Sequence, residues 1–240
     1  MRQILLTFGS SNLRATIDRV ASQAEEMGGY DEIICADESY LDVAFRQKFA
    51  RYLKPNVRGF GYWCWKPEII LQTLLKAGEG DIVQYIDVGS HLNAKGRKRL
   101  DEYFEIARQT PTGVLAFQSG LQGLDQPAPH PSLIWSDLDW CKGDLLDHLG
   151  ARGADYLSTG TIVSGSIFFR RCESAISLVR AWADVSHQDM RLMDDRRSRS
   201  PNPPSFKEHR HDQAVFSLLC KQRCFANNVA QHFCRILKLT

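Results

Sequence analysis

Short apolar runs alternate with amphipathic segments along the first half of the chain, and this alternation restricts the fold more than any other feature. Residues 3–8 read as a buried strand, and apolar side chains then recur at helical spacing over residues 13–24 before a Gly-Gly stop. A second strand pattern covers residues 31–36, and a second helical pattern covers residues 39–52. This order predicts an α/β fold with a mostly parallel central sheet, right-handed crossovers and flanking helices.

The length of 240 residues suits a single domain that spans residues 1–240. Residues 190–205 lose all periodicity and are rich in charge and proline, so we expect a flexible excursion there. A stretch rich in Gly, Gln and Pro over residues 119–131 predicts a binding loop or flap.

The net charge and the cysteines indicate which kind of partner and which cellular compartment to expect. A formal net charge of +2 argues against nucleic acid as a partner. The seven cysteines are scattered and form no CxxC pair, which argues against structural zinc and favours a reducing compartment. The first residues are too short an apolar run for a signal peptide. We therefore expect a cytoplasmic protein, with at most peripheral contact with the inner face of a membrane through basic clusters at 95–99 and 191–199.

A dense aromatic and basic stretch lies about a quarter of the way along the chain, and it reads RGFGYWCWKP from residue 58. Arg58, Tyr62, Trp63 and Lys66 are of the types that bind phosphates and sugar rings. The structural alternative is an aromatic cluster that covers a sheet edge and leaves Lys66 exposed.

A helix pattern over residues 68–76 is followed by a short strand over 82–86, which ends in Asp87. Ligands of open α/β sheets bind at the carboxyl ends of the strands, so Asp87 is the first functional candidate. A carboxylate there suits Mg²⁺ or Mn²⁺. The alternative is an aspartate that caps a helix or a turn.

The densest polar cluster is Glu-His-Arg-His-Asp-Gln at residues 208–213, which can bind metal or phosphate or transfer protons. A metal-dependent hydrolase is one interpretation, but Gln213 stands where such sites continue with His. The structural alternative makes Asp212 the N-cap of a helix over residues 213–221, with histidines on the surface.

Long strings within this chain resemble a known family. GYWCWKPEIILQTL, GDIVQYIDVGS, STGTIVSGSIFFRR and FKEHRHDQAVFSLLCK occur in that order, over residues 4–221. They resemble bacterial glycosyltransferases of the nucleotide-diphospho-sugar transferase (GT-A) fold, which are often found with surface-polysaccharide genes. The chain is more distantly similar to glycogenin-like and galactosyltransferase-like retaining enzymes.

The resemblance implies a site. Those relatives carry an Asp-x-Asp that holds manganese on the donor diphosphate, and Asp87 matches its first aspartate while Gly89 replaces the second. A Mn²⁺ or Mg²⁺ ion would then be held by Asp87 and His211. The other implied positions are the catalytic Asp212 and Gln213, and the donor-binding residues Phe8, Gly9, Ser10, Arg58, Tyr62, Trp63, Lys66, Asp87, Ser164, Gly165, His209 and Arg210.

The function implied is transfer of a sugar from a nucleoside-diphosphate donor, with a UDP-sugar expected, to a glycan or lipid-linked acceptor in surface-polysaccharide synthesis. Residues 208–213 are expected to fold across to Asp87 and complete the site. The alternative is a catalytically silent sugar-nucleotide or glycan-binding protein of the same fold, because Gly89 replaces the second aspartate.

Overall fold

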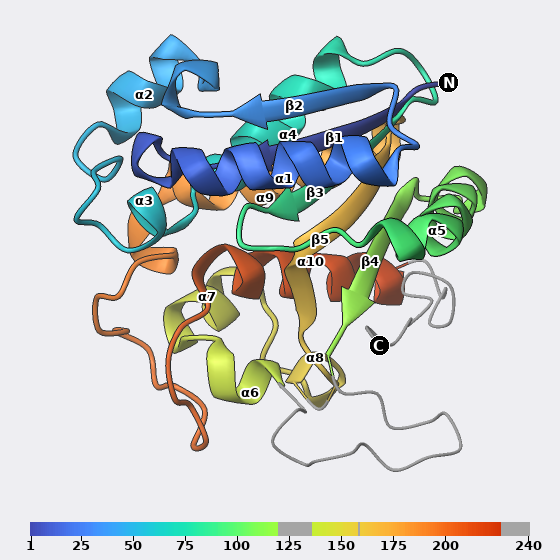
Figure 1. Cartoon of the computed structure of the whole chain (residues 1–240). Coiled ribbons are helices and arrows are strands. Elements are labelled where there is room, and N and C mark those ends of the chain that lie inside the picture. The colour runs from blue at the N-terminus through green and yellow to red at the C-terminus, as the bar shows by residue number, and fades with distance from the viewer. Residues whose placement is uncertain (120–135, 158, 227–240) are drawn as a thin grey trace. The chain divides into compact units, whose positions relative to one another are not determined.

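The computed structural model describes residues 1–119, 136–157 and 159–226, which form an α/β fold with a five-stranded mixed sheet flanked by helices (Figure 1). The strands are β1 (Gln3–Phe8), β2 (Glu32–Ala36), β3 (Ile82–Asp87), β4 (Val114–Gln118) and β5 (Ile162–Arg170). The α-helices are α1 (Arg14–Met27), α2 (Val43–Phe49), α3 (Gly59–Tyr62), α4 (Trp65–Lys76), α5 (Arg97–Gln109), α6 (Asp137–Trp140), α7 (Gly143–His148), α8 (Ala154–Leu157), α9 (Glu173–Gln188) and α10 (His211–Ala226). Short 3₁₀ turns are η1 (Ser11–Leu13), η2 (Glu38–Tyr40), η3 (Ala94–Gly96) and η5 (Met190–Leu192).

The sheet has the strand order β2-β1-β3-β5-β4. Strand β1 pairs in parallel with β2 and β3, which confirms the expected parallel core. Strand β5 departs from that expectation, because it pairs antiparallel with β3, with Ile86 opposite Ser166. Its reversed direction brings Gly165 and Ser166, which are both small, to the carboxyl end of β3.

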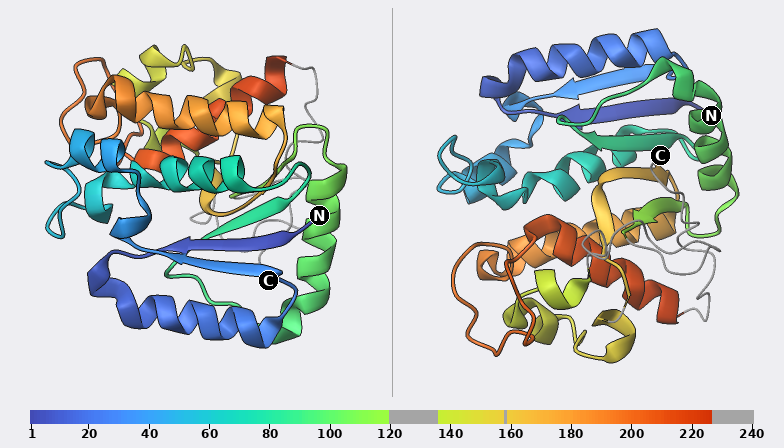
Figure 2. Two further views of the ribbon diagram at one scale, coloured as in Figure 1. Left: turned by 90° about the horizontal axis from the view of Figure 1, so that it is seen from above. Right: turned by 60° about the horizontal axis from the view of Figure 1, so that its bottom comes forward.

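Side chains of β1 alternate between two helical layers, as the two-residue period of a strand requires. Leu5 packs with Val20 and Ala24 of α1, whereas Phe8 stacks on Trp65 of α4, with ring centroids 4.0 Å apart. Helices α1 and α4 lie on opposite faces of the sheet (Figures 1 and 2). Each fully buried large apolar side chain contributes about 1.5 to 3 kcal/mol, so these contacts fix both helices on the strands.

The chain divides into two compact units. Unit 1 comprises Met1–Leu115 and Gly165–Arg180, and unit 2 comprises Ala116–Ser164 and Ala181–Thr240. Strands β4 and β5 and helix α9 contribute residues to both units. The expectation of one domain over residues 1–240 stays a prediction.

Within unit 2, the segment over residues 190–205 is anchored on the first turn of α7. The Asp144 carboxylate accepts hydrogen bonds from the backbone N–H groups of Arg199 and Ser200, at 2.9 and 2.8 Å. The buried Lys142 donates to the carbonyl oxygen of Asp194 at 2.8 Å. These bonds would have to break for the segment to move, and its expected flexibility stays a prediction. Residues 120–131 of the expected loop lie outside the described residues.

Three helices differ in their bounds from the sequence-based expectation. Helix α4 begins at Trp65 rather than residue 68, because Pro67 is tolerated in the first turn, where its missing N–H has no partner to lose. Helix α2 is shorter than residues 39–52, since the Asp42 side chain caps it by accepting from Ala44 N at 2.8 Å. The prediction that Asp212 is an N-cap is wrong, because α10 already begins at His211.

In the described part of the chain, no helix has the length and apolar character needed to cross a membrane.

Candidate functional site

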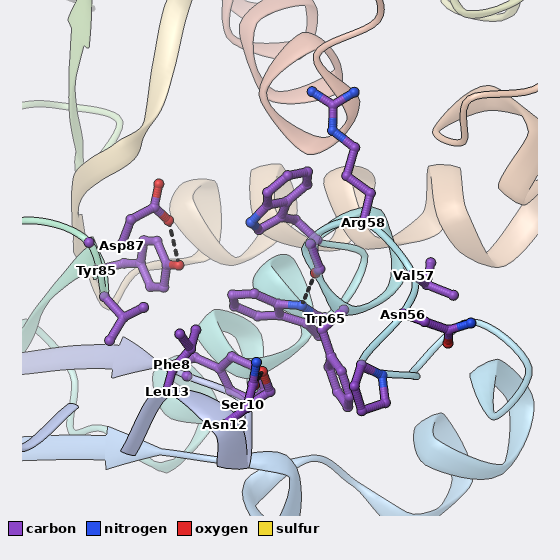
Figure 3. Close-up of a pocket in the computed structure, with 17 residues that line it drawn as sticks. Phe8, Ser10, Asn12, Leu13, Asn56, Val57, Arg58, Trp65, Tyr85 and Asp87 are labelled. Carbon is purple, nitrogen blue, oxygen red and sulfur yellow. Dashed lines mark hydrogen bonds between the residues drawn. The ribbon is translucent and has the colours of Figure 1, made fainter. Parts of the chain in front are cut away.

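A cavity of about 430 Å³ opens in unit 1 at the carboxyl ends of β1 and β3. Figure 3 shows Asp87 and Tyr85 on one side of it and Asn56, Val57 and Arg58 on the other. The lining comes from the end of β1, the turn into α1, the loop before α3, the aromatic turn and the end of β3. Its residues are Phe8, Gly9, Ser10, Asn12, Leu13, Pro55, Asn56, Val57, Arg58, Gly59, Phe60, Trp63, Trp65, Tyr85, Asp87, Val88 and Gly89.

One wall of the cavity is a strained aromatic turn. The five residues from Gly59 to Trp63 all have positive φ, with 51° at Phe60, 56° at Tyr62 and 57° at Trp63. The left-handed conformation costs an L-residue about 1–2 kcal/mol, so these three side chains store roughly 3–6 kcal/mol. Such strain persists only where the surroundings enforce it, and it gathers at binding and catalytic sites.

Packing around Gly59 enforces this turn. The Trp63 ring occupies the space that a Cβ on Gly59 would need. The Trp65 Nε1–H donates to the Gly59 carbonyl oxygen at 2.9 Å. The turn therefore holds two indole rings at the cavity in fixed positions.

The opposite wall carries a carboxylate that is oriented from one side. Oδ1 of Asp87 accepts the Tyr85 hydroxyl at 2.8 Å and lies 3.0 Å from the Lys66 ammonium nitrogen. Oδ2 lies next to Gly165, where an added Cβ would come within 3.0 Å of it. Tyr85 and Asp87 share a face of β3 because they are two residues apart. Tyr85 and Lys66 thus hold the carboxylate through Oδ1. Because Gly165 has no side chain, Oδ2 has space beside it.

Lys66 is buried against that carboxylate. Its side chain is 2% exposed, and its ammonium lies 5.3 Å from the centroid of the Tyr85 ring. The positive end of the helix dipole disfavours a cation in the first turn of α4, and Asp87 compensates for this. The alternative interpretation with an exposed Lys66 is wrong.

These residues fit a divalent cation poorly. No group of three or more His, Cys, Asp or Glu side chains that could hold a metal occurs in the part of the chain that the structure describes. Gly89 offers no side-chain ligand, and a divalent ion on Oδ2 at about 5 Å from the ammonium would be repelled by about 7 kcal/mol at an effective dielectric constant of 20. The expectation of Mn²⁺ or Mg²⁺ at Asp87 stays a prediction.

Unit 2 brings together three other residues of the expected site. The Asp212 carboxylate is buried and accepts the Ser164 hydroxyl at 2.8 Å. The Gln213 side-chain oxygen accepts from Ser164 N at 3.4 Å, and Trp182 Nε1–H donates to the Asp212 carbonyl oxygen at 3.0 Å. Asp212 and Gln213 are therefore positioned together by β5 and α9, and their catalytic role stays a prediction.

The two histidines of the 208–213 cluster, His209 and His211, are buried, so their interpretation as surface histidines is wrong. His209 Nε2–H donates to the Leu192 carbonyl oxygen at 2.9 Å, and Nδ1 accepts from Lys142 N at 3.5 Å. Burial, and then the neighbouring His211, lower the pKa of His209 well below its usual value. A neutral ring satisfies both of its hydrogen-bond partners, which makes His209 a structural support.

His211 and Arg210 are also engaged within unit 2. His211 Nδ1–H donates to the Met193 carbonyl oxygen at 2.6 Å, and Nε2 lies 3.5 Å from the Asp195 carboxylate. The Arg210 guanidinium lies 4.3 Å from the Trp140 ring centroid and 3.1 Å from the Glu208 carboxylate. Their expected metal- and donor-binding roles stay predictions.

Most of the expected unit 1 residues meet at the cavity. Six of them line it, namely Phe8, Gly9, Ser10, Arg58, Trp63 and Asp87, while Lys66 and Gly165 contact Asp87 and Tyr62 is not part of the lining. Sequence reasoning missed Tyr85, although its position two residues before Asp87 on a strand placed it on the same face. It also missed the loop with Asn56 and Val57, which carries no motif.

Comparisons with known proteins give little further information. No protein-family model matches the chain, and no curated protein matches it. Among solved structures, the apo crystal structure of mouse xyloside xylosyltransferase 1 is similar, with 9% sequence identity and a TM-score of 0.42. The match covers 99% of this chain and 85% of that chain. This similarity is distant and concerns the course of the backbone.

Proposed function

We propose that the protein is a glycosyltransferase that binds a nucleoside-diphosphate sugar in the cavity of unit 1. The observation that carries this proposal is the oriented carboxylate of Asp87 at the end of β3, across the cavity from Arg58 (Figure 3). A ligand with hydroxyl groups at one end and phosphates at the other matches this layout.

The chemistry of the lining supports the proposal. Sugar and ribose hydroxyls donate hydrogen bonds well to a carboxylate, and Oδ2 of Asp87 accepts none from the described residues. Arg58 is the one basic residue among the described lining residues, and a guanidinium binds phosphate oxygens in a bidentate manner. Trp63 offers a flat ring to a base or a sugar, whereas Trp65 is buried and stacks on Phe8. The cavity of about 430 Å³ is in the range of small-molecule sites.

The reaction and its partners come from the sequence resemblance. We propose a UDP-sugar as donor, a glycan or lipid-linked acceptor, a role in surface-polysaccharide synthesis, and a cytoplasmic location. Asp212 and Gln213 are proposed as the catalytic pair, because they match the Asp-Gln pair of the related enzymes.

A second candidate function is binding of a sugar nucleotide or glycan without transfer. Gly89 favours this alternative, because the second carboxylate of the Asp-x-Asp pair is missing.

A nucleotide-sugar panel separates the two functions. The full chain is incubated with UDP-, GDP- and CDP-sugars, with and without Mn²⁺, and thermal stabilisation and nucleotide release are recorded. Stabilisation with slow release, lost in Asp87→Ala and Asp212→Ala, is expected for the transferase. Stabilisation without release, even with candidate acceptors, would favour the binding protein. If no nucleotide sugar stabilises the chain, both proposals fail.

A further inference from the structure

We infer that Lys66 takes the place of the divalent metal at the end of β3, so that the site binds its ligand without a metal ion. The inference deepens the proposed function and rests on it only for the identity of the ligand. It starts from the ion pair of Lys66 and Asp87, whose nitrogen and oxygen atoms are 3.0 Å apart.

The first step concerns which atoms of Asp87 a ligand can use. Oδ1 already receives two donors, the Lys66 ammonium and the Tyr85 hydroxyl. Within the described residues, Oδ2 receives no hydrogen bond from the protein. The Asp87 side chain is 42% exposed, so Oδ2 is accessible to a ligand. Oδ2 can therefore accept a hydrogen bond from a hydroxyl group of a ligand, whereas to a metal ion it would be only one protein ligand.

The second step concerns charge. The Lys66 side chain is 2% exposed and lies in the first turn of α4, so it cannot swing into solvent without unpacking that helix end. The ammonium is therefore a fixed positive charge beside Asp87, and the pair as a whole is neutral. A phosphate group that enters the cavity meets no net negative charge there, which removes the electrostatic reason for a bridging cation.

The third step concerns the position of the missing carboxylate. A Cβ built on Gly89 meets no atom within 4 Å, and Gly89 is not among the residues with positive φ. An aspartate would fit at this position. The absence of a second carboxylate is thus not imposed by packing, and it agrees with a site whose cation is already built in.

Binding of Mn²⁺ alone tests the inference directly. Electron paramagnetic resonance measures free Mn²⁺ in titrations of the wild-type chain, Gly89→Asp, and the double variant Lys66→Met with Gly89→Asp. We expect no saturable binding below about 1 mM in the wild type, and at least about 100-fold tighter binding in the double variant than in Gly89→Asp. Lys76→Met with Gly89→Asp is the matched control, since Lys76 is an exposed lysine of the same helix.

Two outcomes would overturn the inference. One is tight Mn²⁺ binding by the wild type that Asp87→Asn abolishes. The other is a folded double variant, checked by circular dichroism, that binds Mn²⁺ no better than Gly89→Asp.

A second arm needs no variant. The affinity for the best nucleotide sugar, measured by calorimetry in EDTA and in Mn²⁺, is expected to agree within about twofold, and a tenfold loss in EDTA would contradict the inference. If no nucleotide sugar binds, the proposed function fails, whereas the Mn²⁺ titrations still decide the role of Lys66.

Discussion

The energetic coupling of Lys66 with Asp87 is the premise on which the electrostatics of the site rests. At 3.0 Å and an effective dielectric constant of 20, two unit charges attract by about 5.5 kcal/mol. Burial of the ammonium opposes this, and breaking a fully buried ion pair costs about 3–5 kcal/mol. Because the Asp87 side chain is 42% exposed, water screens part of the attraction. We expect a net coupling of about 1–3 kcal/mol.

A double-mutant cycle measures this coupling. Lys66→Met, Asp87→Asn and the double variant are unfolded in urea at pH 7. The coupling is the change in the free energy of unfolding of the double variant minus the sum of the changes in the two single variants. The exposed pair of Arg97 and Asp101 on α5 is the control, and its coupling should be at most about 0.5 kcal/mol. If the Lys66–Asp87 coupling is no larger than the control value, the pair is screened by solvent and the reasoning is refuted.

Three further predictions concern packing and protonation. Gly59→Ala should destabilise the chain by about 2–5 kcal/mol in urea unfolding, because the new Cβ meets the Trp63 ring at a φ of +58°. Lys221→Met should cost about 3–5 kcal/mol, since it leaves the fully buried Asp137 carboxylate without its ammonium at 2.6 Å. His209 should make the free energy of unfolding fall as the pH drops below about 6.5, by up to about 1.4 kcal/mol per pH unit, and His209→Gln should remove that slope.

The sign of the His209 effect follows from its lowered pKa. Below about pH 6.5 the unfolded chain binds a proton on this histidine, while the folded chain does not until the pH reaches its lower pKa. Stability is therefore complete above the unfolded pKa and is lost between the two values. An unchanged slope in His209→Gln would show that another group carries the pH dependence.

Matched variants serve as controls for the predictions on Gly59 and Lys221. Gly153→Ala is the control for Gly59→Ala, because its Cβ meets only Tyr156, at an ordinary 3.7 Å, and it should cost less than about 0.5 kcal/mol. For Lys221→Met, the double variant with Asp137→Asn should recover part of the loss, since no buried charge is then left unpaired. A loss of equal size in the single and double variants would contradict the role given to the ion pair.

Periodicity predicted the parallel core of the fold well. The bounds of β1 and the end of α1 follow from apolar spacing and from the Gly28–Gly29 stop, both of which are local signals. The antiparallel course of β5 was not predictable in this way, because strand direction depends on pairing between segments far apart in sequence. The run of left-handed residues from Gly59 to Trp63 was also hidden, since aromatic residues disfavour that conformation.

Part of the lining of the candidate site could be predicted from the residue type and the end of a strand. Asp87 was identified because it ends a strand, and Gly165 because small side chains let a ligand approach a strand, whereas Tyr85 was missed although strand alternation places it on the same face as Asp87. The ion pair with Lys66 was not predicted, because it joins a helix start to a strand end through tertiary packing.

Donor binding in the unit 1 cavity tests the central claim most directly. Calorimetric titration of the full chain with UDP-, GDP- and CDP-sugars should show saturable binding of at least one of them. Arg58→Ala and Trp63→Ala should each weaken that binding by about tenfold or more, which corresponds to at least about 1.4 kcal/mol. An absence of binding by every donor, or binding that both variants leave unchanged, would contradict the account.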